Sequence, residues 1–273
     1  MSLRHENLTH FLLKSTNPGE TIKFVVGPNG NAGDSLIVYG TLLLLDSLGI
    51  KANLHIPTDS FDKNDRIFYT GGGNFVPYYK NCREFFLNNQ HVRQIVLLPH
   101  TIDGQIDLLA KFGSNVVLFA RERVSFRHLT KYMKYPENAY IDHDLAFRVG
   151  PTSIQSLTGG KVETKTGTGT LHAFRKDKET TNNHPIPSDN KDISLLVING
   201  DREITAQGFI RRSRAMLKAI EPFEEVETDR LHVAIASALL GKNITLHRNS
   251  YFKNQAVYDY SLKPYFSRIK LAQ

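Results

Sequence analysis

The chain has little cysteine and no long apolar run. Cys82 is the only cysteine among 273 residues, which excludes an internal disulfide bond and any zinc site built from several cysteines. A lone cysteine of this kind is more typical of a half-buried filler residue than of a nucleophile. The apolar stretch Leu42–Leu45 stops at Asp46, well short of the ~18 residues that a membrane-spanning helix needs. Residues 2–10 are polar and lack a signal-peptide pattern, so we expect a cytoplasmic protein.

Blocks of basic residues are also missing, although the formal net charge is +7. Such a charge suits acidic small substrates, nucleic acid or an anionic membrane surface. Because Lys and Arg are scattered along the chain, the nucleic-acid option is the weakest of these, and we expect no nucleic-acid partner. A purely binding module would explain the charge, but it would leave the motifs described below without a role.

Short β-prone runs alternate with helical stretches along the chain. The expected strands are 22–26, 52–56, 66–70, 94–98, 116–120, 169–175, 193–198, 224–228 and 244–247, and the expected helices are 35–48, 79–88, 105–112, 125–133, 209–220 and 230–240. Strands separated by helices predict parallel sheets covered on both faces, with ligands outside the carboxyl ends of the strands. We expect an α/β protein with two Rossmann-like domains that face a cleft. They comprise residues 1–150 and 169–273, joined by a Gly-, Thr-, Ser- and Lys-rich linker at 151–168.

Two glycine-bearing segments follow strands in the first half. The loop Asn29–Asp34 precedes a helix that Asp34 or Ser35 can cap, and it is equally well an ordinary turn or an anion site at a helix N-terminus. The run Gly71-Gly72-Gly73-Asn74 costs ordering entropy, which favours close approach of the backbone to a ligand. Asn74 would then donate its amide to a substrate oxygen, or cap the next helix.

Polar side chains follow the later strands of the first half. His100 comes after Pro99 at an expected strand end, a suitable place for a side chain that points into a cleft, although a structural or exposed histidine is the commoner case. Arg121 and Glu122 follow the next strand, where a solvated helix start is the alternative. The triplet Asp142–Asp144 has metal-ligand residue types, but successive residues on a strand cannot all point one way, so we expect no metal.

In the second half, Arg175 ends a strand and Asp229 can cap the helix that follows. Arg230 and His232 then lie in the first helical turn, beside free backbone N–H groups. A guanidinium offers a planar fork for carboxylate or phosphate, and a histidine exchanges protons near neutral pH. These features predict an anion site, with an ordinary charged helix start as the alternative.

Taken in order, these motifs resemble the polysaccharide pyruvyl transferase family. The resemblance covers about Gly27 to Ser261 and rests on Asn31-x-Gly33-Asp34, Gly71-Gly72-Gly73-Asn74, Leu98-Pro99-His100-Thr101, Ala120-Arg121-Glu122, Asp142-x-Asp144-Leu145-Ala146-Phe147, Asp229-Arg230-Leu231-His232 and Asn249-Ser250-Tyr251. The family often has Gln where this chain has His100. The resemblance implies a fold like that of the GT-B glycosyltransferases, and transfer of pyruvate from phosphoenolpyruvate to two hydroxyl groups of one sugar as a cyclic ketal.

The resemblance also implies roles for particular residues. The donor phosphoenolpyruvate would be bound by Arg175, Arg230, His232, Asn249 and Ser250, and the acceptor by Asn31, Gly33, Asp34, Gly72, Gly73, Asn74, Arg121 and Glu122. His232 would act as acid or phosphate ligand, and His100 or Asp34 as base or sugar contact. No cofactor or metal is expected. The expected acceptor is a sugar of a cell-surface polysaccharide or of its lipid-linked precursor, with the enzyme at the anionic inner face of the membrane.

A glycosyltransferase of the same architecture is the alternative. It would use a nucleotide sugar, and Arg230 with the adjoining helix N-terminus would bind the diphosphate.

Overall fold

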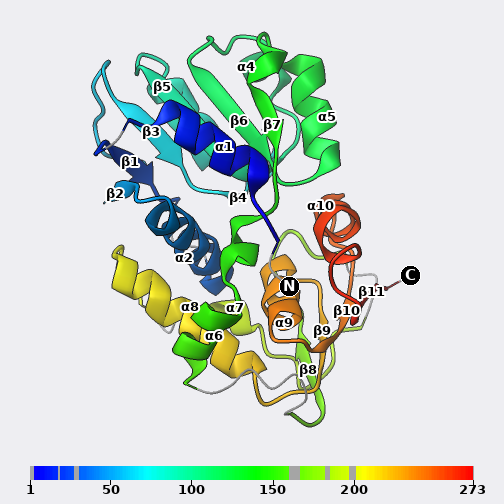
Figure 1. The fold of residues 1–273 in the computed structure, drawn as a ribbon. Helices are drawn as coiled ribbons and strands as arrows, with labels where there is room; N and C mark the ends of the chain where they lie inside the picture. Colours follow the sequence, from blue (N-terminus) through cyan, green and yellow to red (C-terminus); the bar gives the residue numbers. More distant parts are fainter. Residues whose placement is uncertain are drawn as a thin grey trace. The chain divides into compact units, whose positions relative to one another are not determined.

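The computed structural model describes residues 3–17, 19–27, 31–159, 167–181, 185–196 and 201–272. Within these residues, all paired strands are parallel and form two sheets, which confirms the predicted α/β class with parallel sheets (Figure 1). The chain divides into two compact units. One, here called the sheet A unit, comprises Arg4–Asn29 and Thr41–Leu145. The other, the sheet B unit, comprises Met1–Leu3, Gly30–Gly40 and Ala146–Gln273.

Sheet A is a 7-stranded sheet with the order β2-β1-β3-β5-β6-β7, and β4 extends it by pairing with β5. Its strands are β1 (Thr21–Val25), β2 (Lys51–His55), β3 (Arg66–Tyr69), β4 (Gly72–Phe75), β5 (Gln94–Ile102), β6 (Val116–Ala120) and β7 (Ala139–Ile141). All five strands predicted in the first half are present, because each is an apolar run bounded by turn residues.

Two details of sheet A correct the sequence predictions. Gly72 to Asn74 lie within a strand, β4, rather than in a loop. His100 lies inside β5, which continues past the predicted end at residue 98 to Ile102. Pro99 has no N–H for the ladder, and the pairing of β5 with β6 shifts register between Leu97 and His100, so the strand continues through the proline.

Helices cover sheet A. They are α1 (Glu6–Ser15), α3 (Asn81–Asn88), α4 (Ile106–Leu109) and α5 (Arg123–Tyr132), with a 3-10 turn, η1 (Pro136–Asn138), before β7. Apolar side chains from α3, α4 and α5 share one core with alternate residues of the strands: Ile67, Tyr69, Ile95, Leu97, Val116 and Leu118. On the opposite face Phe11 of α1 packs on Phe119 and Tyr140, with ring centroids 5.4 and 5.9 Å apart. Figure 1 shows α1 crossing this sheet.

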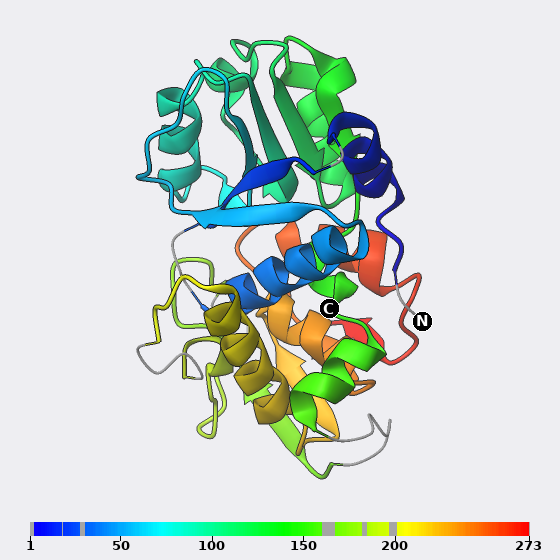
Figure 2. The ribbon, with the colours of Figure 1, turned by 60° about the vertical axis from the view of Figure 1, so that its left-hand side comes forward.

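Sheet B is a 4-stranded sheet with the order β11-β10-β9-β8. Its strands are β8 (Thr170–Ala173), β9 (Glu225–Thr228), β10 (Asn243–Leu246) and β11 (Ile269–Leu271), and its unit also holds η2 from Ala146 onward (Leu145–Arg148), α6 (Pro151–Thr158), α7 (Ile193–Leu196), α8 (Ala206–Ile220), α9 (Leu231–Leu239), α10 (Lys253–Val257) and the π-helical turn η3 (Tyr258–Leu262). Figure 2 shows α8 and α9 beside these strands. Leu171, Val226 and Ile244 are buried between the sheet and its helices.

The sheet B unit differs from the sequence prediction at two places. The predicted strand 193–198 is a helix, α7, over residues 193–196, and its last two residues lie outside the described part of the chain. A four-residue apolar run has no periodicity that separates strand from helix. The predicted linker begins with helix α6, which has Pro151 at its first position and ends at Gly159 with φ 79°. The predicted domain boundaries themselves stay predictions.

Helix α2 (Ala32–Ser47) begins three residues before the predicted start. Asn31 caps it, not Asp34 or Ser35: Asn31 Oδ1 accepts from Gly33 N at 2.8 Å, and Asp34 Oδ2 accepts from Asn31 N at 3.2 Å. This reciprocal arrangement is a capping box. The first residues of α2 belong to the sheet B unit and the later ones to the sheet A unit. No helix in the described ranges is long and apolar enough to cross a membrane.

Candidate functional site

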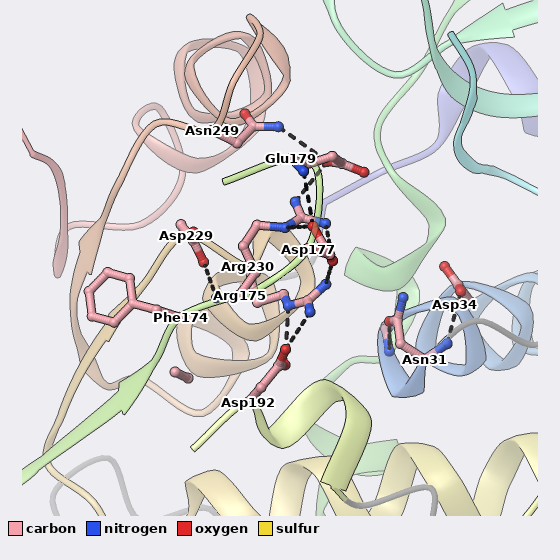
Figure 3. A network of polar contacts seen from close by, with 12 residues as sticks. Asn31, Asp34, Phe174, Arg175, Asp177, Glu179, Asp192, Asp229, Arg230 and Asn249 are labelled. Atoms are coloured by element: carbon pink, nitrogen blue, oxygen red, sulfur yellow. Dashed lines mark hydrogen bonds and ion pairs between the residues drawn. The ribbon is translucent and has the colours of Figure 1, made fainter. Parts of the chain in front are cut away.

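Two buried arginines lie at the carboxyl ends of neighbouring strands in the sheet B unit. Arg175 comes two residues after the end of β8, and Arg230 two residues after the end of β9. These strands pair in parallel, so the two guanidinium groups reach the same edge of the sheet (Figure 3). The arginines are only 4% and 7% exposed. The two arginines predicted to bind the donor therefore lie at one edge of sheet B.

One carboxylate bridges the two guanidinium groups. Asp177 Oδ1 accepts from Arg175 Nε at 2.7 Å and its Oδ2 from Arg175 Nη2 at 3.1 Å. Asp177 Oδ2 also lies 3.0 Å from Arg230 Nη1. Arg230 pairs in addition with Asp192, whose Oδ1 is 3.1 Å from Nε. In this form of the protein, each guanidinium is therefore neutralised by carboxylates of the protein itself.

A second carboxylate, Glu179, extends the cluster. It is buried and accepts from Arg175 Nη1 at 2.7 Å, from Asn249 Nδ2 at 3.3 Å and from Lys253 Nζ. The backbone N of Ser250 donates to the Glu179 carbonyl at 3.0 Å, while the Ser250 side chain is exposed. Arg175, Arg230, Asn249 and the backbone of Ser250, all predicted to bind the donor, thus belong to one polar network.

The charges in this network reinforce one another. Burial alone would lower the pKa of Arg175, but Asp177 and Glu179 outweigh it and raise that pKa above its usual value. Burial would likewise raise the pKa of Asp177, yet Arg175 and Arg230 hold it below its ordinary range. Arg175 and Asp177 are therefore ionised at neutral pH, and an anion that enters the cluster must compete with Asp177 for the two arginines.

Asp229 lies beneath this cluster and is fully buried. Its Oδ1 accepts from the backbone N of Arg175 at 2.8 Å, whereas its Oδ2 makes no hydrogen bond within the described residues. Burial raises the pKa of Asp229 to about 6. The prediction that Asp229 caps α9 is wrong. Arg230 occupies the cap position, and its backbone N donates to Thr228 Oγ1 at 2.9 Å.

His232 lies in the first turn of α9 and contacts the start of α2. A Cβ atom built on Gly33 would lie 2.6 Å from both Cβ and Nδ1 of His232, and 2.8 Å from Asn31 Oδ1. Only glycine fits this position, because any side chain would overlap His232. Gly33, Asn31 and Asp34 were predicted on the acceptor side, but they lie in the same unit as the predicted donor residues (Figure 3). Asn29 and Gly30 lie outside the described residues.

In the sheet A unit, Arg121 and Glu122 have structural partners. Arg121 is 1% exposed and donates from Nε to Thr101 Oγ1 at 2.8 Å and from Nη1 to Asp144 Oδ2 at 2.7 Å. Glu122 caps α5 by accepting from the backbone N of Ser125 at 3.0 Å, and burial raises its pKa. Their predicted contact with an acceptor stays a prediction, since both side chains are engaged inside the fold.

His100 is buried beside β4. Its Nε2 accepts from the backbone N of Asn74 at 2.9 Å, and a Cβ on Gly72, whose φ is 149°, would lie 3.4 Å from its Cε1. Burial and the nearby Arg121 lower the pKa of His100 to about 3. At neutral pH the ring is therefore uncharged, which suits a hydrogen-bonding role better than the transfer of a proton. Gly73 and Asn74 are half-buried on the same strand.

The triplet Asp142–Asp144 also serves the fold. Asp142 Oδ2 accepts from the backbone N of Leu8 in α1 at 2.8 Å. Burial raises the pKa of Asp142 to about 6 and lowers that of His143 to about 4. In the described part of the chain, no group of three or more His, Cys, Asp or Glu side chains is arranged to hold a metal ion.

Sequence reasoning missed the carboxylates and the lysine of the charged cluster. Asp177, Glu179, Asp192 and Lys253 come from three separate loops or helix starts, and none belongs to a motif with fixed spacing. The one signal in the sequence was the pair of acidic residues that follows Arg175 at intervals of two and four.

Comparisons with known proteins show which sequences and structures this chain is similar to. The sequence model of the family described as polysaccharide pyruvyl transferase matches residues 31–245. A putative pyruvyl transferase, EpsO of Bacillus subtilis (strain 168), is 29% identical over 259 residues, which cover 82% of this chain and 80% of that protein. The crystal structure of protein KP1_0663 from Klebsiella pneumoniae subsp. pneumoniae NTUH-K2044 superposes with a TM-score of 0.82 at 28% identity and covers 99% of each chain.

Proposed function

Since this chain belongs to the polysaccharide pyruvyl transferase family, we propose that it transfers pyruvate from phosphoenolpyruvate to two hydroxyl groups of one sugar, as a cyclic ketal. Membership of the family, predicted from the ordered motifs, is confirmed. It supports a transferase that acts in polysaccharide synthesis. The donor, the ketal product and the residue roles below are our proposal.

The observation that carries the proposal is the Asp177 carboxylate, which bridges Arg175 and Arg230 at 2.7 to 3.1 Å. Phosphoenolpyruvate carries a carboxylate and a phosphate close together, and two adjacent guanidinium groups match such a pair of anions. The side chain of Asp177 is 40% exposed, so it is the partner that an entering ligand displaces most readily. We assign the carboxylate and phosphate of the donor to the two arginines.

The reaction requires one proton on carbon and removes two from the acceptor. Protonation of the methylene carbon makes C2 of the donor an oxocarbenium-like centre, and the first sugar hydroxyl attacks C2 and loses its proton. The bond from C2 to the phosphate oxygen then breaks, phosphate leaves with the electron pair, and the second hydroxyl closes the ring and loses its proton. Cations held around the phosphate stabilise the charge that develops on the leaving group.

His232 is the proposed proton donor or phosphate ligand, because it shares the first turn of α9 with Arg230 and is held against Gly33. Asp34 is the proposed base, and it lies one residue from Gly33 on the same helix. His100 is proposed as a sugar contact only, since its pKa of about 3 keeps it from exchanging protons near neutral pH. The proposed reaction uses no cofactor and no metal.

Calorimetric titration of the full chain with phosphoenolpyruvate, and separately with UDP-glucose, tests the donor. We expect phosphoenolpyruvate to bind and UDP-glucose to produce no heat. Incubation with phosphoenolpyruvate and an acceptor polysaccharide should then release inorganic phosphate. Binding of UDP-glucose alone, with release of nucleoside diphosphate on adding acceptor, would instead show the glycosyltransferase alternative.

We also propose that the acceptor is carried on a lipid at an anionic membrane surface, in keeping with the net charge of +7. Sedimentation with vesicles of phosphatidylglycerol at low salt tests this point. We expect the protein in the pellet at low salt and in the supernatant at high salt. Protein that stays in the supernatant at both salt concentrations would contradict surface association.

A further inference from the structure

Several polar side-chain atoms of the sheet A unit are buried without a hydrogen bond within the described residues, His100 Nδ1 among them, and two others belong to side chains that lie close to Gly27. These two are Thr70 Oγ1 and Asn74 Oδ1, which are shielded from solvent and make no hydrogen bond within the described residues. Thr70 is 8% exposed. Buried polar atoms without a partner are rare in native proteins and destabilise the fold, so each requires an explanation. Atoms waiting for a ligand are one such explanation.

Both atoms lie where a parallel sheet binds ligands. Thr70 directly follows β3 and Asn74 lies in β4, which continues the sheet beyond the end of β3. In the order β2-β1-β3-β5, the direction in which the chain adds strands reverses between β1 and β3. Ligands of open α/β sheets bind at such a switch point, outside the carboxyl ends of the strands.

The groups around these atoms converge on one backbone position, Gly27, two residues after β1. A Cβ on Gly27 would lie 3.5 Å from Thr70 Cγ2, 3.5 Å from the Tyr69 hydroxyl and 3.8 Å from Asn74 Nδ2. Within the described residues, Asn74 Nδ2 donates to that hydroxyl at 3.5 Å, and its Oδ1 makes no hydrogen bond. Gly27 and Asn74 are partly exposed, and the cluster therefore lies just below the surface.

The polar groups of this cluster are uncharged. They comprise two hydroxyls, an amide and the neutral ring of His100, whose Nε2 is occupied by the Asn74 backbone. The nearest buried charges, Arg121 and Asp144, are paired with each other at 2.7 Å. A phosphate or carboxylate would find no cation among the described residues of this cluster, whereas sugar hydroxyls can both donate to and accept from these groups.

We infer that Thr70 Oγ1 and Asn74 Oδ1 bind hydroxyl groups of an uncharged sugar ring, so that this end of sheet A is the acceptor subsite. The inference rests on the proposed function for the identity of the reaction, but not for the chemistry of the subsite. It adds Thr70 to the predicted acceptor residues and assigns Gly27 the role of leaving space for the ring.

Thr70→Val gives a direct test, because it removes the hydroxyl and keeps the shape of the side chain. If the Thr70 hydroxyl makes a hydrogen bond only to a bound ligand, Thr70→Val leaves the melting temperature of the free protein unchanged or raises it. The substitution replaces a polar atom that has no partner in the described residues by a methyl group. The matched control is Thr101→Val. Thr101 is also buried in the same sheet, but its Oγ1 accepts from Arg121, so this variant should lower the melting temperature.

Binding is measured by saturation-transfer NMR on the full chain, with methyl β-D-galactopyranoside and methyl β-D-glucopyranoside as neutral probes and methyl β-D-glucuronoside as the charged probe. At least one neutral glycoside should bind wild type, and more tightly than the charged probe. Thr70→Val should raise its dissociation constant about 3- to 10-fold, the loss of one hydrogen bond, and Thr101→Val by less than 2-fold.

Three results would overturn the inference: no neutral glycoside binds wild type, the charged probe binds better, or Thr70→Val lowers the melting temperature as Thr101→Val does and leaves binding intact. Titration of the same proteins with phosphoenolpyruvate separates this inference from the proposed function. Wild type that binds a neutral glycoside at Thr70 but not phosphoenolpyruvate would refute the proposed donor and keep the subsite.

Discussion

The two units build polar clusters in the same way and fill them with opposite chemistry. Each cluster lies at the carboxyl ends of parallel strands, β8 and β9 in one unit and β3 to β5 in the other. The cluster on sheet B consists of acidic and basic side chains that pair with each other, such as Arg175 with Asp177 and Glu179, next to the buried Asp229. The cluster on sheet A consists of uncharged groups, and Thr70 Oγ1 and Asn74 Oδ1 make no hydrogen bond within the described part of the chain.

This difference shows how a site can be ready for a ligand in two ways. Buried arginines cannot stay unpaired, because an isolated buried charge is very costly, so in the proposed donor site Asp177 occupies the position between the arginines where the anionic donor would bind. A single neutral hydroxyl or amide oxygen can stay unpaired at a cost of about 1–3 kcal/mol. A charged site is therefore recognised by its internal counter-ions, and a neutral one by its unsatisfied atoms.

The largest expected effect is on the charged cluster. Arg230→Lys keeps the positive charge but loses the planar fork, and should weaken phosphoenolpyruvate binding about 10- to 100-fold in calorimetry, the range of one charge-assisted hydrogen-bonded pair. Arg211→Lys is the control, because Arg211 is an exposed arginine paired with Asp201 and Glu203. Equal affinities in both variants would remove Arg230 from the donor site.

The contact between α2 and α9 is tested by Gly33→Ala. The added methyl group would lie 2.6 Å from His232, so we expect a loss of about 1–3 kcal/mol in the free energy of unfolding, together with weaker phosphoenolpyruvate binding. Gly150→Ala is the matched control, because the nearest atom to its Cβ is 3.9 Å away. Urea denaturation of both variants measures the effect, and an unchanged Gly33→Ala would mean that His232 is not held there.

Asp229 makes the stability of the sheet B unit depend on pH. Its pKa of about 6 exceeds that of an unfolded aspartate, so the folded state binds more protons than the unfolded state between about pH 4 and 6, and stability falls as pH rises through that window. Asp229→Asn keeps an oxygen for the Arg175 amide and puts no charge at Oδ2. We expect the free energy of unfolding of Asp229→Asn to exceed that of wild type by about 1–3 kcal/mol at pH 8 and to equal it at pH 4.

Urea denaturation at the two pH values measures this difference. An Asp229→Asn protein that is less stable than wild type at pH 8 would show that the Asp229 carboxylate has a partner that stabilises its charge. Burial would then not destabilise the ionised form of Asp229.

The smallest effect concerns the cap of α2. Asn31→Ala removes the oxygen that accepts from Gly33 N and should lower the free energy of unfolding by about 1 kcal/mol. Thermal unfolding followed by circular dichroism measures it. A larger loss, accompanied by loss of phosphoenolpyruvate binding, would indicate that Asn31 acts in the site as well as in the cap.

The sequence was sufficient for much of the fold because its strands are apolar runs bounded by turn residues. The sequence was insufficient where an apolar run was too short to show a period, or where the structure depends on contacts that residue types alone do not specify. The run Ile193–Leu196 carries no periodicity and forms α7 instead of a strand. The cap at Asn31 and the long strand through Pro99 depend on hydrogen bonds and register that residue types do not specify.

For the site, the motifs located Arg175 and Arg230, because strand ends in parallel sheets are predictable. They could not show that Asp177 bridges the two arginines or that Gly33 lies against His232. They also could not show that burial lowers the pKa of His100 to about 3. Those facts depend on packing between residues far apart in the sequence.

The most direct test of the central claim is a crystal structure of the full chain with phosphoenolpyruvate bound. We expect its carboxylate and phosphate oxygens within hydrogen-bonding distance of the guanidinium groups of Arg175 and Arg230, with Asp177 no longer between them. Phosphoenolpyruvate bound at Thr70 and Asn74, or found elsewhere while Asp177 still bridges the two arginines at saturating ligand, would contradict the assignment of the donor to the charged cluster.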